Sequence, residues 1–116
     1  MSETYRPVVN HLTRIILKLI EEPVPYDLVA PSEQNPPTAA GVRNFGERLA
    51  RRTARVAAMM DALAARGFTF KLEKDRVFAD STEMEAQDAK RYLLTQGFED
   101  TEFQVLLEYA RKWDTL

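Results

Sequence analysis

The chain has 116 residues, 45% of them apolar and 29% charged, which predicts one globular domain over residues 1–116 and argues against a disordered chain. It contains no cysteine and one histidine, which excludes disulfides, thiolate catalysis, cysteine-based zinc sites and paired-histidine metal sites. The net charge of −2 combines a basic middle with an acidic end: residues 39–76 hold nine basic against four acidic side chains, and residues 77–116 hold four against nine.

This charge asymmetry has two readings. The basic middle could pack against the acidic end and neutralise it, within one molecule or between two copies, or it could bind an anionic ligand. We favour the first. The amino terminus has no basic leader, and its best apolar run, residues 15–20, is too short to span a bilayer. We therefore expect a cytoplasmic protein that does not contact a membrane.

The first predicted element is an amphipathic helix over residues 1–22. Its apolar residues fall at alternating spacings of four and three, which is typical of one helix face. Residues 23–37 contain five of the six prolines and are expected to form a linker. The helix stripe consists of Tyr5, Val9, Leu12, Ile16 and Leu19.

The longest predicted helix covers residues 38–66, with Thr38 as its N-cap. Apolar residues recur every seven positions along it, as in a seam packed against another helix, and the first helix is the expected antiparallel partner. The seam residues are Val42, Leu49, Val56 and Leu63.

Residues 68–80 alternate in polarity and predict a β-hairpin with Lys74 and Asp75 as its two-residue loop. This register pairs Leu72 with Val77. The glycines of Gly67-Phe68 and Gly97-Phe98 are both expected to end helices in the left-handed conformation, each phenylalanine folding back onto a leucine five residues earlier.

Residues 82–113 are predicted to form two helices, the first starting at Ser81 or Thr82 and ending at Gly97. In the second, Val105 and Tyr109 lie off the main apolar stripe, which suggests contact with two neighbours. The expected fold class is therefore α+β and mainly helical: helix, helix, β-hairpin, helix, helix, with two long antiparallel helices covered by the hairpin and the C-terminal helices.

No catalytic, cofactor-binding or metal-binding residue set is recognisable. The single histidine, His11, is expected to be structural, and the scattered glycines form no phosphate-binding loop. No family is identified from the residues. We expect a protein that is not an enzyme and needs no cofactor.

Arginines cluster on one arc of the long helix, and the hairpin that follows adds further basic residues. A basic helix followed by a basic β-ribbon resembles the way winged helices address DNA. The alternative, which we favour, is that the arginine face pairs with the acidic C-terminal helices. The candidate nucleic-acid or interaction face comprises Arg48, Arg51, Arg52, Arg55, Lys71, Lys74 and Arg76.

Phe78 lies opposite Lys71 on the outer face of the predicted hairpin, away from its apolar neighbours. Together with the broad apolar surface of the last predicted helix it suggests an interface with a second subunit or another protein, unless a C-terminal helix covers that face or the register is shifted. The candidate interface residues are Phe78, Val105, Tyr109 and Trp113.

The first functional hypothesis is therefore a small protein-interaction or regulatory module that forms a homodimer. The alternative is a nucleic-acid-binding regulator that uses the basic helix and hairpin. The arginines thus have three candidate environments: solvent, nucleic acid or the acidic C-terminal segment.

Overall fold

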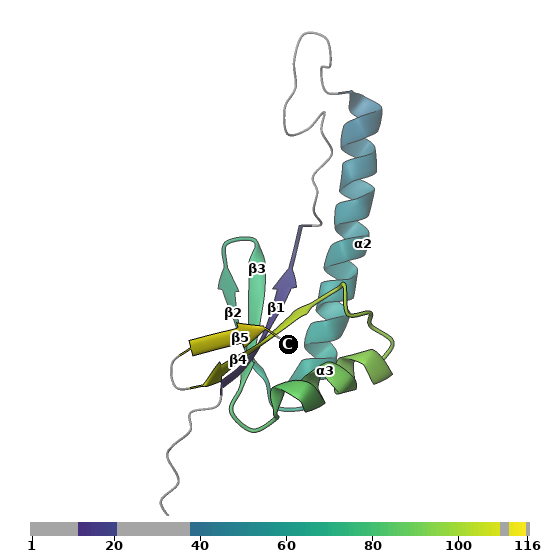
Figure 1. Cartoon of the computed structure of the whole chain (residues 1–116). Coiled ribbons are helices and arrows are strands. Elements are labelled where there is room, and N and C mark those ends of the chain that lie inside the picture. The colour runs from purple at the N-terminus through teal and green to yellow at the C-terminus, as the bar shows by residue number, and fades with distance from the viewer. Residues whose placement is uncertain (1–11, 21–37, 110–111, 116) are drawn as a thin grey trace, which may run out of the picture.

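The computed structural model describes residues 12–20, 38–109 and 112–115, which form five strands and two helices (Figure 1). The predicted linker 23–37 and His11 lie outside the described residues. The elements are β1 (Leu12–Lys18), α2 (Ala39–Ala64), β2 (Thr69–Glu73), β3 (Arg76–Ser81), α3 (Ala86–Thr95), β4 (Gln104–Tyr109) and β5 (Lys112–Thr115).

The five strands form one antiparallel sheet in the order β2-β3-β1-β4-β5. Helix α2 connects β1 to β2 across β3, and α3 connects β3 to β4 across β1, so two split βαβ units interlock in the ferredoxin-like arrangement. Strand β5 is added at one edge. The predicted mainly helical fold is wrong, because the described residues contain two helices and an extended sheet rather than four helices and a hairpin.

The predicted first helix is wrong over residues 12–18, which form the central strand β1. Three consecutive residues, Ile15, Ile16 and Leu17, are no more than 7% exposed. Ile15 and Leu17 face the helices, and Ile16 is buried on the other side of this central strand, which has a neighbour on each edge. A surface helix, in contrast, keeps one polar side. The β-branched side chains of Thr13, Ile15 and Ile16 also favour extended backbone.

The predicted last helix is also wrong: residues 104–109 and 112–115 form β4 and β5. Phe103 and Val105 are buried, whereas Gln104 between them is exposed, which is the period of two expected of a strand. The spread of apolar residues around the supposed helix was therefore the alternation of a strand. The predicted start of the next helix at Ser81 or Thr82 is wrong as well, because α3 begins at Ala86 with Glu85 as its N-cap. Ser81 ends β3, and its hydroxyl accepts hydrogen bonds from the backbone N–H groups of Glu83 and Met84 in the turn before the helix.

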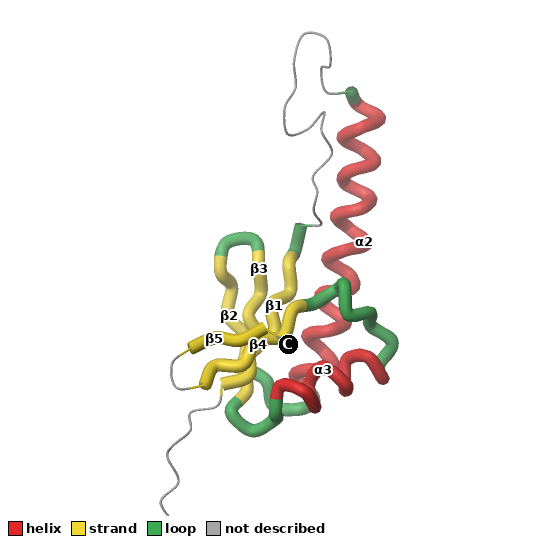
Figure 2. The backbone as a smooth tube through the Cα atoms, in the orientation of Figure 1, coloured by secondary structure: helices red, strands yellow, loops and turns green. Residues whose placement is uncertain are grey.

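The core lies between the sheet and both helices, which cover the same face (Figure 2). Ile15 and Leu17 of β1 meet Met59 and Leu63 of α2 and Leu93 of α3, and all five side chains are fully buried. The buried hydroxyl of Thr13 donates a hydrogen bond to the Met84 carbonyl oxygen at 2.8 Å, so this polar group is satisfied inside the core.

The local predictions for the hairpin and the caps are confirmed. Leu72 pairs with Val77 across the β2–β3 hairpin, and Lys74 in its turn has φ 58°. The backbone N–H of Gly41 donates to the Thr38 hydroxyl oxygen at the start of α2. Gly67 and Gly97 have positive φ, and the N–H groups of Phe68 and Phe98 bond the carbonyls of Leu63 and Leu93, as Schellman caps require.

Helix α2 packs on the sheet only through its C-terminal half. Its buried side chains are Val56, Met59 and Leu63, whereas Val42 is 52% exposed. Figure 1 shows the N-terminal part of α2 extending past the end of the sheet. The predicted antiparallel pairing of two long helices is therefore wrong, because β1 occupies the place of the partner.

Adjacent leucines of α3 test this packing. Leu93 is fully buried and Leu94 is 43% exposed, so the same substitution should have different costs. We expect Leu93→Ala to lower the free energy of unfolding by about 2–5 kcal/mol through the cavity that it leaves. Leu94→Ala should cost less than about 1 kcal/mol. Urea denaturation followed by circular dichroism measures both, and equal losses would contradict the described orientation of α3.

Candidate functional site

The sheet face opposite the helices carries an arginine held between two aromatic rings. The Arg14 guanidinium lies 4.5 Å from the centroid of the Phe78 ring and 4.8 Å from that of Trp113. Its Nε and Nη2 donate hydrogen bonds of 2.8 and 3.0 Å to the two carboxylate oxygens of Asp80. Bidentate pairing and ring contacts together hold the arginine in one orientation.

The strand register explains this cluster. Arg14 faces Asp80 on β3 and Leu106 on β4, while Trp113 on β5 faces Glu108 of β4. Paired residues of antiparallel strands project on the same side, so these side chains share the face that neither α2 nor α3 covers. We call this surface the open face. Its central residues are Leu12, Arg14, Ile16, Phe78, Asp80, Leu106, Glu108 and Trp113.

The charge of the open face is nearly balanced. Arg14 is matched by Asp80, and the hydrogen bond that Arg14 donates to the Asp80 carboxylate raises the pKa of the arginine despite partial desolvation. Among the other central residues, Glu108 is acidic and the rest are apolar. Toward β2 the same face also carries Lys71, whose ammonium lies 5.9 Å from the centroid of the Phe78 ring, and Glu73, which faces Arg76. The centre of the surface is therefore aromatic and aliphatic around one neutralised cation.

The structure brings together two of the four predicted interface residues. Phe78 and Trp113 lie on the open face, joined by Arg14, which the sequence analysis did not single out. Val105 is 1% exposed and belongs to the core, and the side chain of Tyr109 is outside the described part. The sequence did contain one indication of this role: Arg14 lies between Thr13 and Ile15, so in a strand whose side chains alternate between faces it lies on the opposite face from both.

A second surface feature is a cleft of about 450 Å³ at the end of β1. It lies where α2 passes the loop that leads into β4. Four of its described lining residues are cationic and one is acidic, so we call it the basic cleft. Its described lining residues are Lys18, Ile20, Arg51, Arg52, Arg55, Thr101 and Glu102.

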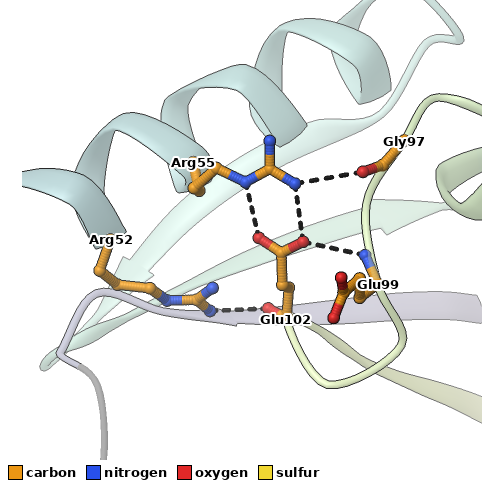
Figure 3. Close-up of polar contacts among 5 residues, drawn as sticks. All are labelled: Arg52, Arg55, Gly97, Glu99 and Glu102. Atoms are coloured by element: carbon orange, nitrogen blue, oxygen red, sulfur yellow. Dashed lines mark hydrogen bonds and ion pairs between the residues drawn. The ribbon is translucent and has the colours of Figure 1, made fainter.

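Two arginines of the cleft attach α2 to the end of β1 and to the loop between α3 and β4, and Figure 3 shows their contacts with that loop. Arg55 donates two hydrogen bonds of 2.8 Å to the Glu102 carboxylate and one of 3.2 Å to the Gly97 carbonyl. Arg52 donates to the carbonyl oxygens of Lys18 and Glu102 at 2.7 and 2.6 Å. These bonds satisfy the backbone carbonyl oxygen of Lys18 at the end of β1 and those of Gly97 and Glu102 in the loop between α3 and β4.

The contact between Arg55 and Glu102 shifts the pKa values of both residues. Its hydrogen bond is the largest cause that holds the pKa of Glu102 below the ordinary 4.5, reinforced by the N–H of Glu99, which donates to the carboxylate at 2.9 Å. The same bond raises the pKa of Arg55. One arginine of the basic middle therefore meets an acidic residue of the C-terminal segment, which supports intramolecular neutralisation at this point.

The predicted basic residues separate into two groups. Arg48 and Arg51 belong with Arg52 and Arg55 on α2, and Arg51 is exposed. The other group is on the hairpin that forms one edge of the sheet. It consists of Lys71 on β2, Lys74 in the turn and Arg76, whose guanidinium lies 3.9 Å from Asp75.

Lys18 connects these two groups and was missed by the sequence analysis. It lines the basic cleft, and in the β1–β3 register it is paired with Arg76. The signal was present as a single lysine that interrupts the apolar run at residues 15–20. Only the pairing of β1 with β3 shows that this lysine lies beside the hairpin.

The described residues contain no group of three or more histidine, cysteine, aspartate or glutamate side chains that could hold a metal ion. No helix among them has the length and apolarity needed to cross a bilayer. Comparison of the chain with protein-family models, with curated proteins and with solved structures yields no match.

The Arg55–Glu102 pair predicts how stability depends on pH. Because the pKa of Glu102 is depressed in the folded state, its contribution is present above the unfolded pKa and is lost as pH falls through the folded pKa. We expect Glu102→Gln to lower the melting temperature by a few degrees at pH 7. The difference from the wild type should shrink below pH 4.5.

Thermal melts from neutral to acidic pH measure this difference. The matched control is Glu47→Gln, which makes the same substitution at an exposed position of α2. A gap between wild type and Glu102→Gln that stays constant down to the acid limit would contradict the assignment.

Proposed function

We propose that this chain is a protein-interaction module whose docking surface is the open face. The observation that carries the proposal is Arg14, held between Phe78 and Trp113 at the centre of a sheet face that no described helix covers. Tryptophan and arginine are the residue types most enriched among energetically dominant interface positions. Their fixed orientation means that little side-chain entropy is lost on binding.

The charge balance of this surface favours a protein over a polyanion. Nucleic-acid binding depends on cations that release counterions from phosphates, and Arg14 is already paired with Asp80. The partner that fits is a protein segment with apolar or aromatic side chains to cover Phe78 and Trp113. It should also offer a carbonyl or carboxylate oxygen to the arginine, which has five N–H donors.

Site-specific photo-crosslinking tests this proposal. Thr115 is exposed and is paired with Leu106 beside the cluster, so a benzophenone side chain placed there samples the open face. In extract of the producing cells we expect a discrete crosslinked protein. Its yield should fall at least tenfold in Phe78→Ala and Trp113→Ala.

Val42→Ala, at an exposed position on the distant part of α2, is the matched control and should leave the yield unchanged. The proposal fails if the crosslink is insensitive to Phe78 and Trp113, or if nuclease treatment removes the crosslinked product.

A second candidate function, nucleic-acid binding, is favoured by the basic cleft. Lys18, Arg51, Arg52 and Arg55 line one depression, and Arg76 lies next to Lys18 in the register. Phosphate groups bind where several cations converge. Arg52 and Arg55 are the weaker members of this set, because the Arg52 guanidinium already donates to the carbonyl oxygens of Lys18 and Glu102 and that of Arg55 to the Glu102 carboxylate.

Arg51 is the residue to test, because reversing Arg55 would also break its contact with Glu102. Fluorescence anisotropy with a labelled single strand and a labelled duplex should show affinity that falls steeply with salt. Arg51→Ala should reduce the slope of log affinity against log salt by about 1, which corresponds to the loss of one phosphate contact. Arg43→Ala, at an exposed position of the same helix, is the control. Absence of retention at low salt would eliminate this candidate.

A further inference from the structure

Strand β2 is an edge strand with an unusually exposed apolar side chain. Among the described residues it pairs only with β3, and Leu72 is 66% exposed on the side of the sheet that faces the helices. Four of its five residues are exposed. An open edge presents unpaired backbone N–H and C=O groups that another strand can join.

We propose that β2 pairs antiparallel with β2 of a second copy of this chain, in a register centred on Leu72. This register places Lys71 of each copy opposite Glu73 of the other on the outer side of the sheet. The two Leu72 side chains meet on the helix side. The occupant of the edge is thus a second copy, because the strand is complementary to itself in charge and in apolarity.

The backbone geometry agrees with this centre. The turn at residues 74–75 makes Glu73 and Arg76 the flanking pair of the hairpin. Hydrogen-bonding direction alternates along an antiparallel strand, so the backbone groups of Leu72 point away from β3 toward the open edge. Two Leu72 residues facing each other would form a hydrogen-bonded pair, and the flanking Lys71–Glu73 pairs would take the closer, non-hydrogen-bonded positions.

The other symmetric registers are poorer. Centring on Lys71 or on Glu73 places like charges directly opposite each other, which destabilises the pairing. Centring on Phe70 leaves Lys71 opposite Thr69 and forms no ion pair. Only the centre on Leu72 uses both charges and the exposed leucine.

The resulting dimer would join five strands from each copy into one sheet. Its twofold axis is perpendicular to the sheet, so the two open faces point the same way and lie side by side. The interface is a single short strand, and small interfaces of this kind are weak, with a dissociation constant on the order of 10–100 μM. The β2 edge adjoins the open-face cluster, because the Lys71 ammonium lies 5.9 Å from the centroid of the Phe78 ring. The inference does not rest on the proposed function.

Charge reversal with complementary mixing tests the register. Lys71→Glu places only carboxylates along the shared edge, and Glu73→Lys places only ammonium groups there. Each variant alone should self-associate at least tenfold more weakly than the wild type. An equimolar mixture of the two should recover association as a heterodimer, and the double variant K71E/E73K should recover it as a homodimer. Sedimentation velocity from about 10 μM to about 1 mM covers the expected range.

Arg43→Glu, an exposed charge reversal on α2, is the matched control and should leave association unchanged. Since Glu73 faces Arg76 within the hairpin, thermal melts must show that each variant remains folded. Hydrogen exchange gives a second readout without substitution: the Leu72 amide should become protected as concentration rises.

A wild type that is monomeric across the range, or association that is indifferent to Lys71 and Glu73, overturns the inference. So does a mixture that fails to recover association. Each of these results leaves the open-face proposal standing, because that proposal is tested through Phe78 and Trp113 on other strands.

Discussion

The central position of β1 is the constraint on which the rest of the structure depends. Because this strand pairs with both β3 and β4, its inward side chains, such as Ile15 and Leu17, anchor the core against both helices. Its outward side chains are equally consequential. Arg14 organises the open face, and Lys18 at the end of the strand lines the basic cleft. Both candidate surfaces are therefore arranged around one strand.

The arginines of α2 show how one residue type can serve structure and surface together. Arg52 and Arg55 attach α2 through the carbonyls of Lys18 and Gly97 and the carboxylate of Glu102. Arg55 also stacks on Phe98, with 4.7 Å between the guanidinium carbon and the ring centroid. The Arg55 side chain is nearly half exposed, so solvent screening keeps its pairing with Glu102 modest. These contacts mainly fix the position of α2 against the loop that leads into β4.

The surfaces differ in what they can recognise. The open face has few uncompensated charges and rigid aromatic groups, which suit a protein partner. The basic cleft has several cations around one carboxylate and suits phosphate. The β2 edge offers backbone groups and a self-complementary charge pattern, which suit a second copy. Pairing through β2 would also present two open faces together and would raise the effective affinity for a repeated partner.

Local chemistry was readable from the sequence alone. The Thr38 cap, the left-handed glycines at 67 and 97, and the hairpin around residues 74–75 were all predicted, because each depends on residues within a few positions of one another. The position of Phe78 on the outer side of the hairpin follows from the same register. One helix of the four predicted, residues 39–64, was recovered almost entirely.

The assignment of residues 12–18, 104–109 and 112–115 to strands required information from the tertiary structure. Ile15, Ile16 and Leu17 fit either a helix stripe or a central strand, and their pairing with residues of β3, sixty or more positions further along the chain, decides between the two. The choice of strand then decides that Arg14 meets Asp80 and that Lys18 lies beside Arg76. Spacing along the chain determines which side chains can share a face, but only long-range hydrogen bonding determines whether that face belongs to a helix or a sheet.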